Sequence, residues 1–174
     1  MNIKTFEFKK LDGYIIENPE KYVKDWIKIN PHGIITIGCD SQAHGRRLKF
    51  SVVVCMQYID AAGQGHGAHV IATNIWEKRN TKFARGKQGA MEEMPSKLWK
   101  EAELVLAVAQ LIDGNDEIFK KRITVHLDYN ALPEYESSMF FAAGIGFITG
   151  MGYKAEGKPN AWCATHTADA LCRY

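Results

Sequence analysis

The sequence predicts an α/β protein with a mixed sheet of five strands, three antiparallel and then parallel ones, flanked by helices. Two observations lead to this fold class. Three segments rich in β-branched and aromatic residues follow one another through short links, and later strand-like segments alternate with segments of helical periodicity. Short links favour antiparallel neighbours, whereas a helical crossover places the next strand parallel to an earlier one.

The first predicted element is a short covering helix near the N-terminus. Asn18 is a suitable N-cap, Pro19 fits the first helical position, and Gly33 follows the end of the pattern. The apolar stripe of this helix consists of Tyr22, Val23, Trp26 and Ile27. We interpret residues 1–174 as a single domain with a short N-terminal helical extension at about residues 1–32.

The later elements follow from the alternation of two periodicities. Strands are predicted where β-branched residues dominate, and helices where apolar residues recur at helical spacing. A proline directly before Ser96 supports the start of the longest helix there. The predicted order is strands at 34–40, 48–58 and 68–76, a helix from Ser96 to about Gly114, a strand at 122–130, a helix at 133–152, a strand at 153–157 and a helix at 158–174.

Composition limits the partners and the compartment. The 22 Lys and Arg residues against 20 Asp and Glu leave a formal charge of +2, too near zero to indicate a nucleic-acid partner by bulk charge. The N-terminal segment carries charges too early for a signal peptide, and no run of about 18 apolar residues occurs. We therefore expect a soluble, cytoplasmic protein without membrane contact, and its oligomeric state stays open. The four cysteines lack paired CxxC spacing, which favours buried free thiols over disulfides or a structural zinc site.

Two predicted strands end on an aspartate. Asp40 lies in "ITIGCDSQ" and Asp128 in "RITVHLDYN". The crossover rule places these strands side by side and parallel, so both carboxylates are expected at the same end of the sheet. Carboxylates this close do not both stay ionised without a cation between them. The alternative is that each aspartate caps a turn, because Ser41 and Asn130 are turn formers.

Two helical acids complete the candidate site. Glu101 and Asp169 lie among apolar positions, where a charge is least expected for solvation alone. An oxygen-rich cluster suits Mg²⁺ or Mn²⁺, which in pairs stabilise the attacking and leaving oxygens of a phosphoryl displacement. One alternative is that Asp169 only pairs with Arg173 on the helix surface. The acids that compete with Glu101 are Glu92, Glu93 and Glu103.

Histidines and basic residues extend this candidate site. His126 shares the predicted face of Asp128 and His166 lies one turn before Asp169, so either could orient a water or accept a proton, unless it only supports the fold. Lys158 lies at a predicted helix entry, where phosphate binding is favoured. A basic segment after the third strand is interpreted either as a solvated loop or as a phosphate-contacting lip. The members of this basic segment are Lys78, Arg79, Lys82, Arg85 and Lys87.

Four sequence blocks are similar to signature blocks of a known family: "IGCDSQ", "HLDYN", "GFITGMGY" and "KPNAWCATHTADALCR". Over residues 34–173, approximately, the chain resembles the YkuK-like family of predicted ribonuclease H-like nucleases. The resemblance implies a ribonuclease H-like fold with acids gathered at a divalent-metal site. The matching acids are Asp40 of the first strand, Asp128 of the fourth strand, Asp169 of the last helix and, through "KLWKEAELVLAVA", Glu101.

We therefore hypothesise a divalent-metal-dependent nuclease. The four acids would hold one or two Mg²⁺ or Mn²⁺ ions, and a metal-activated water would attack the phosphodiester of RNA, DNA or a hybrid. A first alternative is a nucleic-acid-binding or interaction module with a degenerate site, using the basic segment and aromatics such as Trp99 or Trp162. A second, less favoured alternative is a hydrolase of small phosphate esters.

Overall fold

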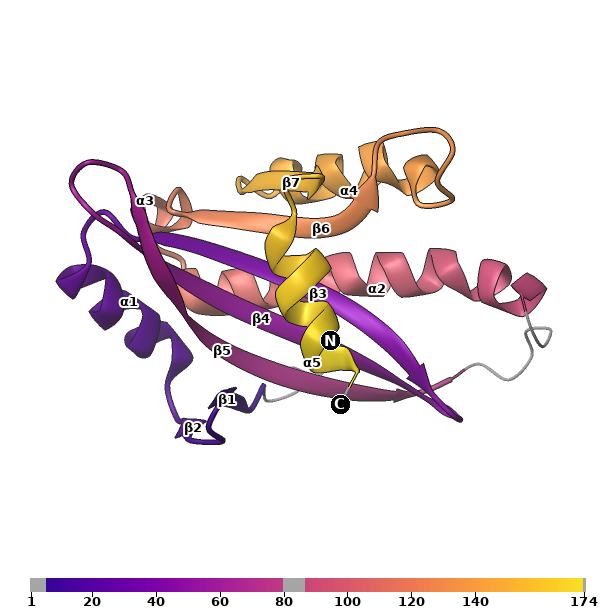
Figure 1. The fold of residues 1–174 in the computed structure, drawn as a ribbon, viewed down its shortest axis with the longest axis horizontal. Helices are drawn as coiled ribbons and strands as arrows, with labels where there is room; N and C mark the ends of the chain where they lie inside the picture. Colours follow the sequence, from indigo (N-terminus) through magenta and orange to yellow (C-terminus); the bar gives the residue numbers. More distant parts are fainter. Residues whose placement is uncertain (1–5, 80–86, 174) are drawn as a thin grey trace.

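A computed structural model describes residues 6–79 and 87–173 and shows one sheet with helices on both of its faces (Figure 1). The strand order across the sheet is β2-β1-β5-β4-β3-β6-β7. The strands are β1 Phe8–Lys10, β2 Ile15–Ile16, β3 Ile34–His44, β4 Arg47–Ile59, β5 Gly65–Lys78, β6 Ile123–Asn130 and β7 Lys154–Lys158. The helices are α1 Pro19–Ile29, α2 Lys87–Asp113, α3 Glu117–Lys120, α4 Ser138–Gly150, the π-helix η1 Cys163–Ala168 and α5 Asp169–Cys172.

The pairing of the central strands confirms the predicted fold class. β3, β4 and β5 are antiparallel neighbours, whereas β6 pairs with β3 and β7 pairs with β6 in parallel register. The sheet exceeds the five predicted strands because β1 and β2 form a hairpin that pairs with β5. Strands this short carry too few residues to show an alternating pattern in the sequence.

The first predicted strand continues past its expected end. β3 runs on to His44 because residues 41–44 pair with residues 47–50 of β4 across a hairpin. Gly45 in the turn has a φ of +61°, which a two-residue hairpin turn requires. Asp40 therefore lies inside a strand, and the alternative in which it caps a turn is wrong.

Several helices begin elsewhere than predicted. α2 begins at Lys87 instead of Ser96, so Pro95 lies inside it. A proline removes one backbone hydrogen bond, but the turn before it is held by an ion pair between Glu93 and Arg79. The predicted α4 and the last helix begin later than expected, and α3 was not predicted. Helix boundaries here depend on tertiary contacts that local sequence does not encode.

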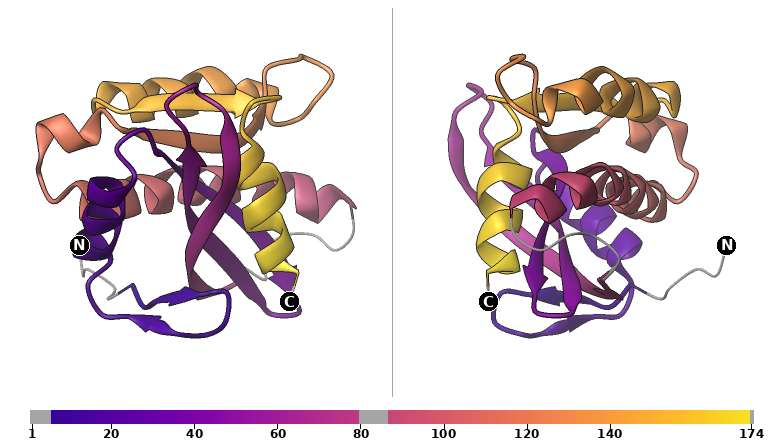
Figure 2. Two further views of the ribbon diagram at one scale, coloured as in Figure 1. Left: turned by 60° about the vertical axis from the view of Figure 1, so that its left-hand side comes forward. Right: turned by 90° about the vertical axis from the view of Figure 1, so that its right-hand side faces the viewer.

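The helices divide between the two faces of the sheet. α1, α2 and α4 cover one face, and η1 with α5 crosses the other face over β3 and β4 (Figure 2). Because side chains alternate along a strand, Ile35, Ile37 and Cys39 face α2, whereas Thr36 and Gly38 face η1. We call these the α2 face and the α5 face of the sheet.

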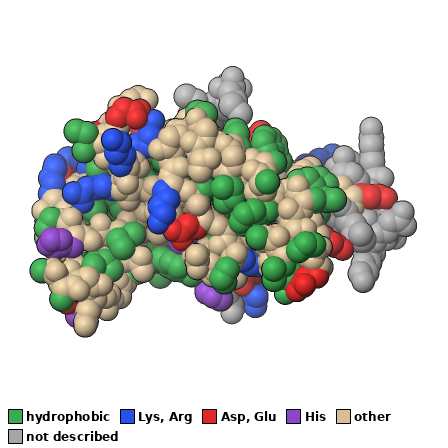
Figure 3. All heavy atoms as spheres, turned by 90° about the horizontal axis from the view of Figure 1, so that it is seen from above, with side chains coloured by type: hydrophobic (Ala, Val, Ile, Leu, Met, Phe, Trp, Pro, Cys, Tyr) green, Lys and Arg blue, Asp and Glu red, His purple; other side chains and the backbone are tan. Residues whose placement is uncertain are grey.

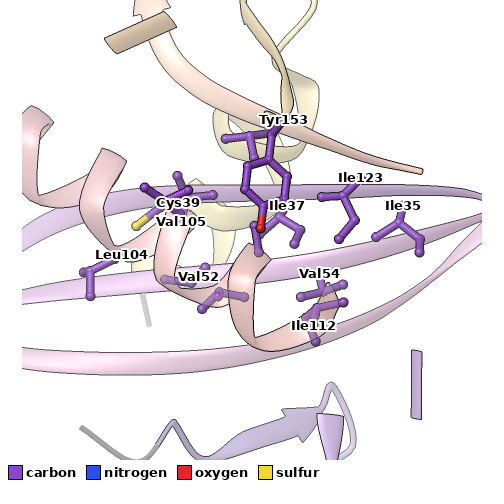
Figure 4. Packing of buried hydrophobic residues seen from close by; sticks show 14 of the residues in the cluster. Ile35, Ile37, Cys39, Val52, Val54, Leu104, Val105, Ile112, Ile123 and Tyr153 are labelled. Atoms are coloured by element: carbon purple, nitrogen blue, oxygen red, sulfur yellow. The ribbon is translucent and has the colours of Figure 1, made fainter. Parts of the chain in front are cut away.

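The main hydrophobic core lies between the sheet and α2 (Figure 4). Its central side chains are Ile37 of β3, Val54 of β4, Ile123 of β6, and Val105 and Ile112 of α2, all buried. Burial of such apolar surface is the main favourable contribution to folding. The four cysteines are buried and free, as the sequence predicted.

The outer surface over α4 is poor in charge. None of residues 138–150 is charged. Figure 3, which views the molecule from this side, shows mainly hydrophobic and uncharged side chains over its middle, with Lys and Arg gathered toward one end. In the part of the chain that the structure describes, no helix is both long and apolar enough to cross a membrane.

Candidate active site

Asp40 and Asp128 occupy matching positions on neighbouring strands. The parallel register pairs Gly38 of β3 with His126 of β6, and each aspartate lies two residues further along its strand. Because side chains alternate, both carboxylates lie on the α5 face. The predicted parallel pairing of the two strands is confirmed, and it places Asp40 and Asp128 at the same end of adjacent strands.

The Asp40 carboxyl is half-buried in a negative environment. Burial raises its pKa to about 6, and repulsion from Asp128 and Asp169 contributes to the rise. A hydrogen bond from the Ser41 backbone and the charge of Lys97 act in the opposite direction. Three aspartates, from β3, β6 and α5, therefore share one electrostatic environment.

Glu101 approaches Asp40 from the α2 face. Its side chain is only 4% exposed, and its Oε1 accepts a hydrogen bond from Ser41 Oγ. Burial and then the charge of Asp40 raise the pKa of Glu101 to about 8. Lys97, one turn earlier on α2, lowers this pKa and donates a hydrogen bond from Nζ to the Ser41 carbonyl at 3.2 Å.

The other glutamates of α2 lie in different surroundings. Glu93 is buried and pairs with Arg79 at 2.8 Å. Glu103 Oε2 lies 3.8 Å from Lys100 Nζ on the helix surface, and Glu92 is exposed. Glu101 is thus the glutamate of α2 that senses the charge of Asp40.

Two elements, η1 and β7, contact the Asp128 carboxylate of β6. Oδ1 accepts a hydrogen bond from Thr165 Oγ1 of η1 at 2.8 Å and lies 2.9 Å from Lys158 Nζ of β7. The Asp128 side chain remains 24% exposed. The carboxylate is therefore oriented by a hydroxyl and a cation while one edge stays open to solvent.

Asp169 begins α5 and pairs with Arg173 one turn later. Arg173 Nε donates to Oδ1 at 3.1 Å, and Nη2 donates to Oδ2 at 2.5 Å. The surface ion pair considered as an alternative role is therefore present. The same carboxylate also contributes to the raised pKa of Asp40, so the ion pair does not isolate it from the site.

The far end of α5 is fixed to the sheet. Lys49 Nζ donates to the Leu171 carbonyl at 2.6 Å, and His44 Nε2 donates to the Cys172 carbonyl at 2.9 Å. Donors at a helix C-terminus satisfy carbonyls that have no partner within the helix. These contacts hold a very short helix, and with it Asp169, against β3 and β4.

The two histidines have different surroundings. His126 is buried, and its Nδ1 accepts a hydrogen bond from the Cys163 backbone N–H at 3.2 Å. Burial lowers the pKa of His126 to about 4, so the ring stays neutral and supports η1. His166 is exposed on η1, one turn before Asp169. The structure thus leaves His166 accessible and gives His126 a structural contact.

The predicted basic residues separate into three groups. Lys78 is exposed at the end of β5, whereas Arg79 is engaged by Glu93. Lys158 lies at the acid cluster, beside Asp128. The predictions for Lys82 and Arg85, and for the side chain of Lys87, concern positions outside the described residues.

Two residues that act on the acids of the site are not among the residues predicted from the sequence. Lys97 precedes Glu101 by four positions, a helical spacing at which opposite charges meet, so this signal was available. Thr165 lies inside the block that carries Asp169, but its contact with Asp128 joins segments far apart in the chain. No local pattern reports such a contact.

The donor chemistry of the acids fits a hard divalent cation. Within the described ranges, no three Asp, Glu, His or Cys side chains are grouped so that they could hold a metal ion, and Asp128 and Asp169 face Lys158 and Arg173. The acids nevertheless offer carboxylate oxygens, which Mg²⁺ and Mn²⁺ prefer. Burial is the main cause of the raised pKa of Asp40, and the charges of Asp128 and Asp169 add to the rise although each of these two acids is paired with a cation.

The order of antiparallel and parallel strands, with helices on both faces of the sheet, is that of a mixed α/β fold. The family model described as Ribonuclease H-like matches residues 20–173, which is most of the chain. The chain therefore belongs to the ribonuclease H-like family, and the resemblance to its YkuK-like branch is confirmed. The comparison with curated proteins and that with solved structures each gave no match.

Proposed function

We propose that the protein is a divalent-metal-dependent nuclease that hydrolyses phosphodiester bonds of RNA, DNA or a hybrid. One observation carries the proposal: Asp128 of β6 and Asp169 of α5 lie near enough to Asp40 of β3 for their charges to add to the effect of burial, and the pKa of Asp40 rises to about 6. Concentrated, incompletely balanced carboxylates are typical of a cation site. The family match supports the same class.

Asp40, Asp128 and Asp169 would hold the Mg²⁺ or Mn²⁺. Glu101 would act on this site from the α2 face of the sheet, where it is bonded to Ser41. The bound cation would supply Lewis acidity to an attacking water and to the leaving oxygen. Ser41 keeps Glu101 directed toward β3, and Thr165 holds Asp128 in one orientation. These hydroxyl contacts restrict the carboxylates, because a ligand held in one rotamer loses less entropy on binding.

Lysines of the chain contribute positive charge beside the acids. Lys158 lies 2.9 Å from Asp128, and Lys97 acts on both Asp40 and Glu101. A phosphate that approaches these carboxylates meets electrostatic repulsion, which Lys158 beside Asp128 reduces. Lys158 therefore binds and orients the phosphate, and His166, exposed one turn before Asp169, is placed to move a proton.

A second candidate is a nucleic-acid-binding module with a degenerate site. The observation that favours it is the pairing of Asp128 with Lys158 and of Asp169 with Arg173, because a carboxylate already paired with a cation binds a metal less readily. Such a module would bind phosphates without hydrolysing them. Metal dependence separates the two candidates.

Metal binding is tested by calorimetric titration of Mn²⁺ into chelator-treated protein. We expect wild type to bind one or two ions with release of protons, and Asp128→Asn to lose this binding. Asp25→Asn on α1 is the matched control, because Asp25 is also an aspartate paired with lysines, Lys21 and Lys28. If wild type binds no Mn²⁺ even with an oligonucleotide present, the binding module replaces the nuclease.

Cleavage is tested with labelled single-stranded RNA, single-stranded DNA and a hybrid in Mn²⁺. Asp40→Asn is expected to reduce the rate more than about 100-fold, equivalent to about 2.7 kcal/mol of transition-state stabilisation. Cleavage by Asp40→Asn at the wild-type rate would refute the proposal. Turnover of bis(4-nitrophenyl) phosphate without cleavage of any polymer would point to a small phosphate-ester hydrolase.

A further inference from the structure

The α5 face of the sheet extends beyond the acids. Directly opposed residues of antiparallel strands point to the same face, so Asp40 shares a row with Ser51 and Asn74. The next row on this face begins two residues further along β3, at Gln42. It continues through Lys49 of β4 to Trp76 of β5. By ordinary sheet spacing, Trp76 lies roughly 12 Å from Asp40.

This extension is only partly covered by α5. Lys49 and His44 bond the last carbonyls of α5, so the helix ends above them. Gln42, Arg47 and Trp76 are exposed. Figure 1 shows the β3–β4 hairpin and the end of β5 projecting past α5. Exposed residues of the α5 face, Gln42 of β3 and Trp76 of β5, therefore lie beyond Asp40, next to the end of α5.

Trp76 is an exposed aromatic side chain held in a fixed orientation. Its indole is 40% exposed, its ring centroid lies 5.4 Å from that of His44, and the Arg47 guanidinium lies 4.5 Å from its centroid. A large apolar side chain exposed at the end of a strand gains nothing from burial. Indole and guanidinium together offer two planar groups on which an unpaired base stacks.

The surface around Trp76 is positively charged. Arg46 lies in the turn of the hairpin and Arg47 follows it, and Lys78 lies opposite Arg47 on the neighbouring strand. All three side chains are exposed, and the ion pairs found among the described residues involve none of them. Unpaired cations next to an aromatic plane match the charge of a nucleic-acid backbone.

We infer that the Trp76–Arg47 surface binds a single-stranded segment of the nucleic acid whose phosphodiester is cleaved at the acids. One base stacks on the indole and guanidinium, and Lys78 and Arg46 contact phosphates. The inference rests on the proposed function, because it names the substrate of the same site. A base must be unpaired to stack on the exposed indole, and a single strand offers such bases whereas a duplex does not.

Binding is measured apart from cleavage, by fluorescence anisotropy of labelled dT12 and U12 with Asp128→Asn protein in chelator. We expect Trp76→Ala in that background to weaken binding about tenfold, and Trp76→Phe to retain most of it, because phenylalanine keeps an aromatic face on which the base stacks. A 12-base-pair duplex should bind more weakly and be insensitive to Trp76→Ala. Arg47→Ala should reduce the salt dependence.

Trp99→Ala is the matched control. Trp99 is exposed to a similar degree, 43%, but lies on α2 and packs on Phe147, so its removal should leave binding within about twofold. Far-ultraviolet circular dichroism and thermal unfolding confirm that each variant folds. Equal binding by the Trp76→Ala and Trp99→Ala proteins overturns the inference even if wild type cleaves. If wild type does not cleave but its binding still depends on Trp76, the binding surface stands and the proposed nuclease function is refuted.

Discussion

The two faces of β3 differ sharply although they belong to one strand. On the α2 face, Ile35, Ile37 and Cys39 are fully or almost fully buried among apolar side chains. On the α5 face, Gly38 lets η1 approach the backbone, and Asp40 follows it at the edge of the helix. The alternation of side chains that places apolar residues in the core therefore also places a carboxylate on the opposite face of the strand.

Glu101 is the exception that connects the two faces. It is a charged residue on the dry side of the sheet, where it bonds Ser41 and senses Asp40. A buried carboxyl without a cation destabilises the folded state when it ionises. The α2 face therefore carries an electrostatic penalty that apolar packing offsets.

The largest effect is expected for Glu101→Gln, which keeps a hydrogen-bond acceptor for Ser41 and removes the charge. The pKa of Glu101 is about 8 in the folded protein and 4.5 in the free side chain. Between pH 4.5 and pH 8, Glu101 is therefore protonated in the folded protein and ionised in the unfolded chain. Wild type therefore loses stability relative to Glu101→Gln as the pH rises from 4.5 to 8. In chelator at pH 7.5 we expect the variant to be more stable by about 3 kcal/mol, measured by urea unfolding.

Glu103→Gln provides the control for this experiment. Glu103 is on the same helix but one-third exposed beside Lys100, so its neutralisation should change stability by less than about 0.5 kcal/mol. An equal stability of wild type and Glu101→Gln across the pH range would show that the Glu101 carboxyl is not desolvated.

A smaller effect is expected for Gly38→Ala, which tests the contact of β3 with η1. A Cβ at Gly38 would lie 2.6 Å from the Ala164 nitrogen and 2.9 Å from its Cα, so backbone atoms must shift. We expect a loss of about 2 kcal/mol in urea unfolding. The displacement of η1 should also weaken the Thr165 to Asp128 hydrogen bond and reduce Mn²⁺ affinity.

Gly146→Ala is the matched substitution on α4. A Cβ there meets no atom within 4 Å, and alanine is the better helix former. Stability should therefore stay unchanged or rise by up to about 1 kcal/mol. If Gly38→Ala left the stability unchanged, as expected for Gly146→Ala, η1 would not approach the β3 backbone as closely as described.

The smallest effect concerns His126, whose buried ring supports η1 on the α5 face. Its folded pKa is about 4 against 6.5 for the free side chain, so the unfolded chain binds more protons in this window and stability is lost as the pH falls. His126→Asn retains an acceptor for the Cys163 N–H and does not titrate. Relative to this variant, wild type should lose about 1 kcal/mol between pH 7 and pH 5.5, as followed by urea midpoints. A constant difference would mean that His126 titrates normally.

Sequence reasoning located the acids better than their surroundings. Asp40 and Asp128 were placed together because strand order and crossover handedness follow from the alternation of elements. The helical spacing of Lys97 and Glu101 is visible in the sequence. In contrast, Trp76 is not distinguished from the other residues of its predicted strand. Its exposure results from where α5 ends, which depends on contacts of α5 with His44 and Lys49.

By itself the sequence determined the mixed sheet, the α1 cap and the strands that carry the two central aspartates, since these depend on local periodicity and short-range links. Only the tertiary structure decided that β3 continues past Asp40, that Lys158 lies against Asp128, and that Trp76 remains uncovered. These features join residues distant in the chain. Their energies arise from packing and desolvation, which exist only once the elements have assembled.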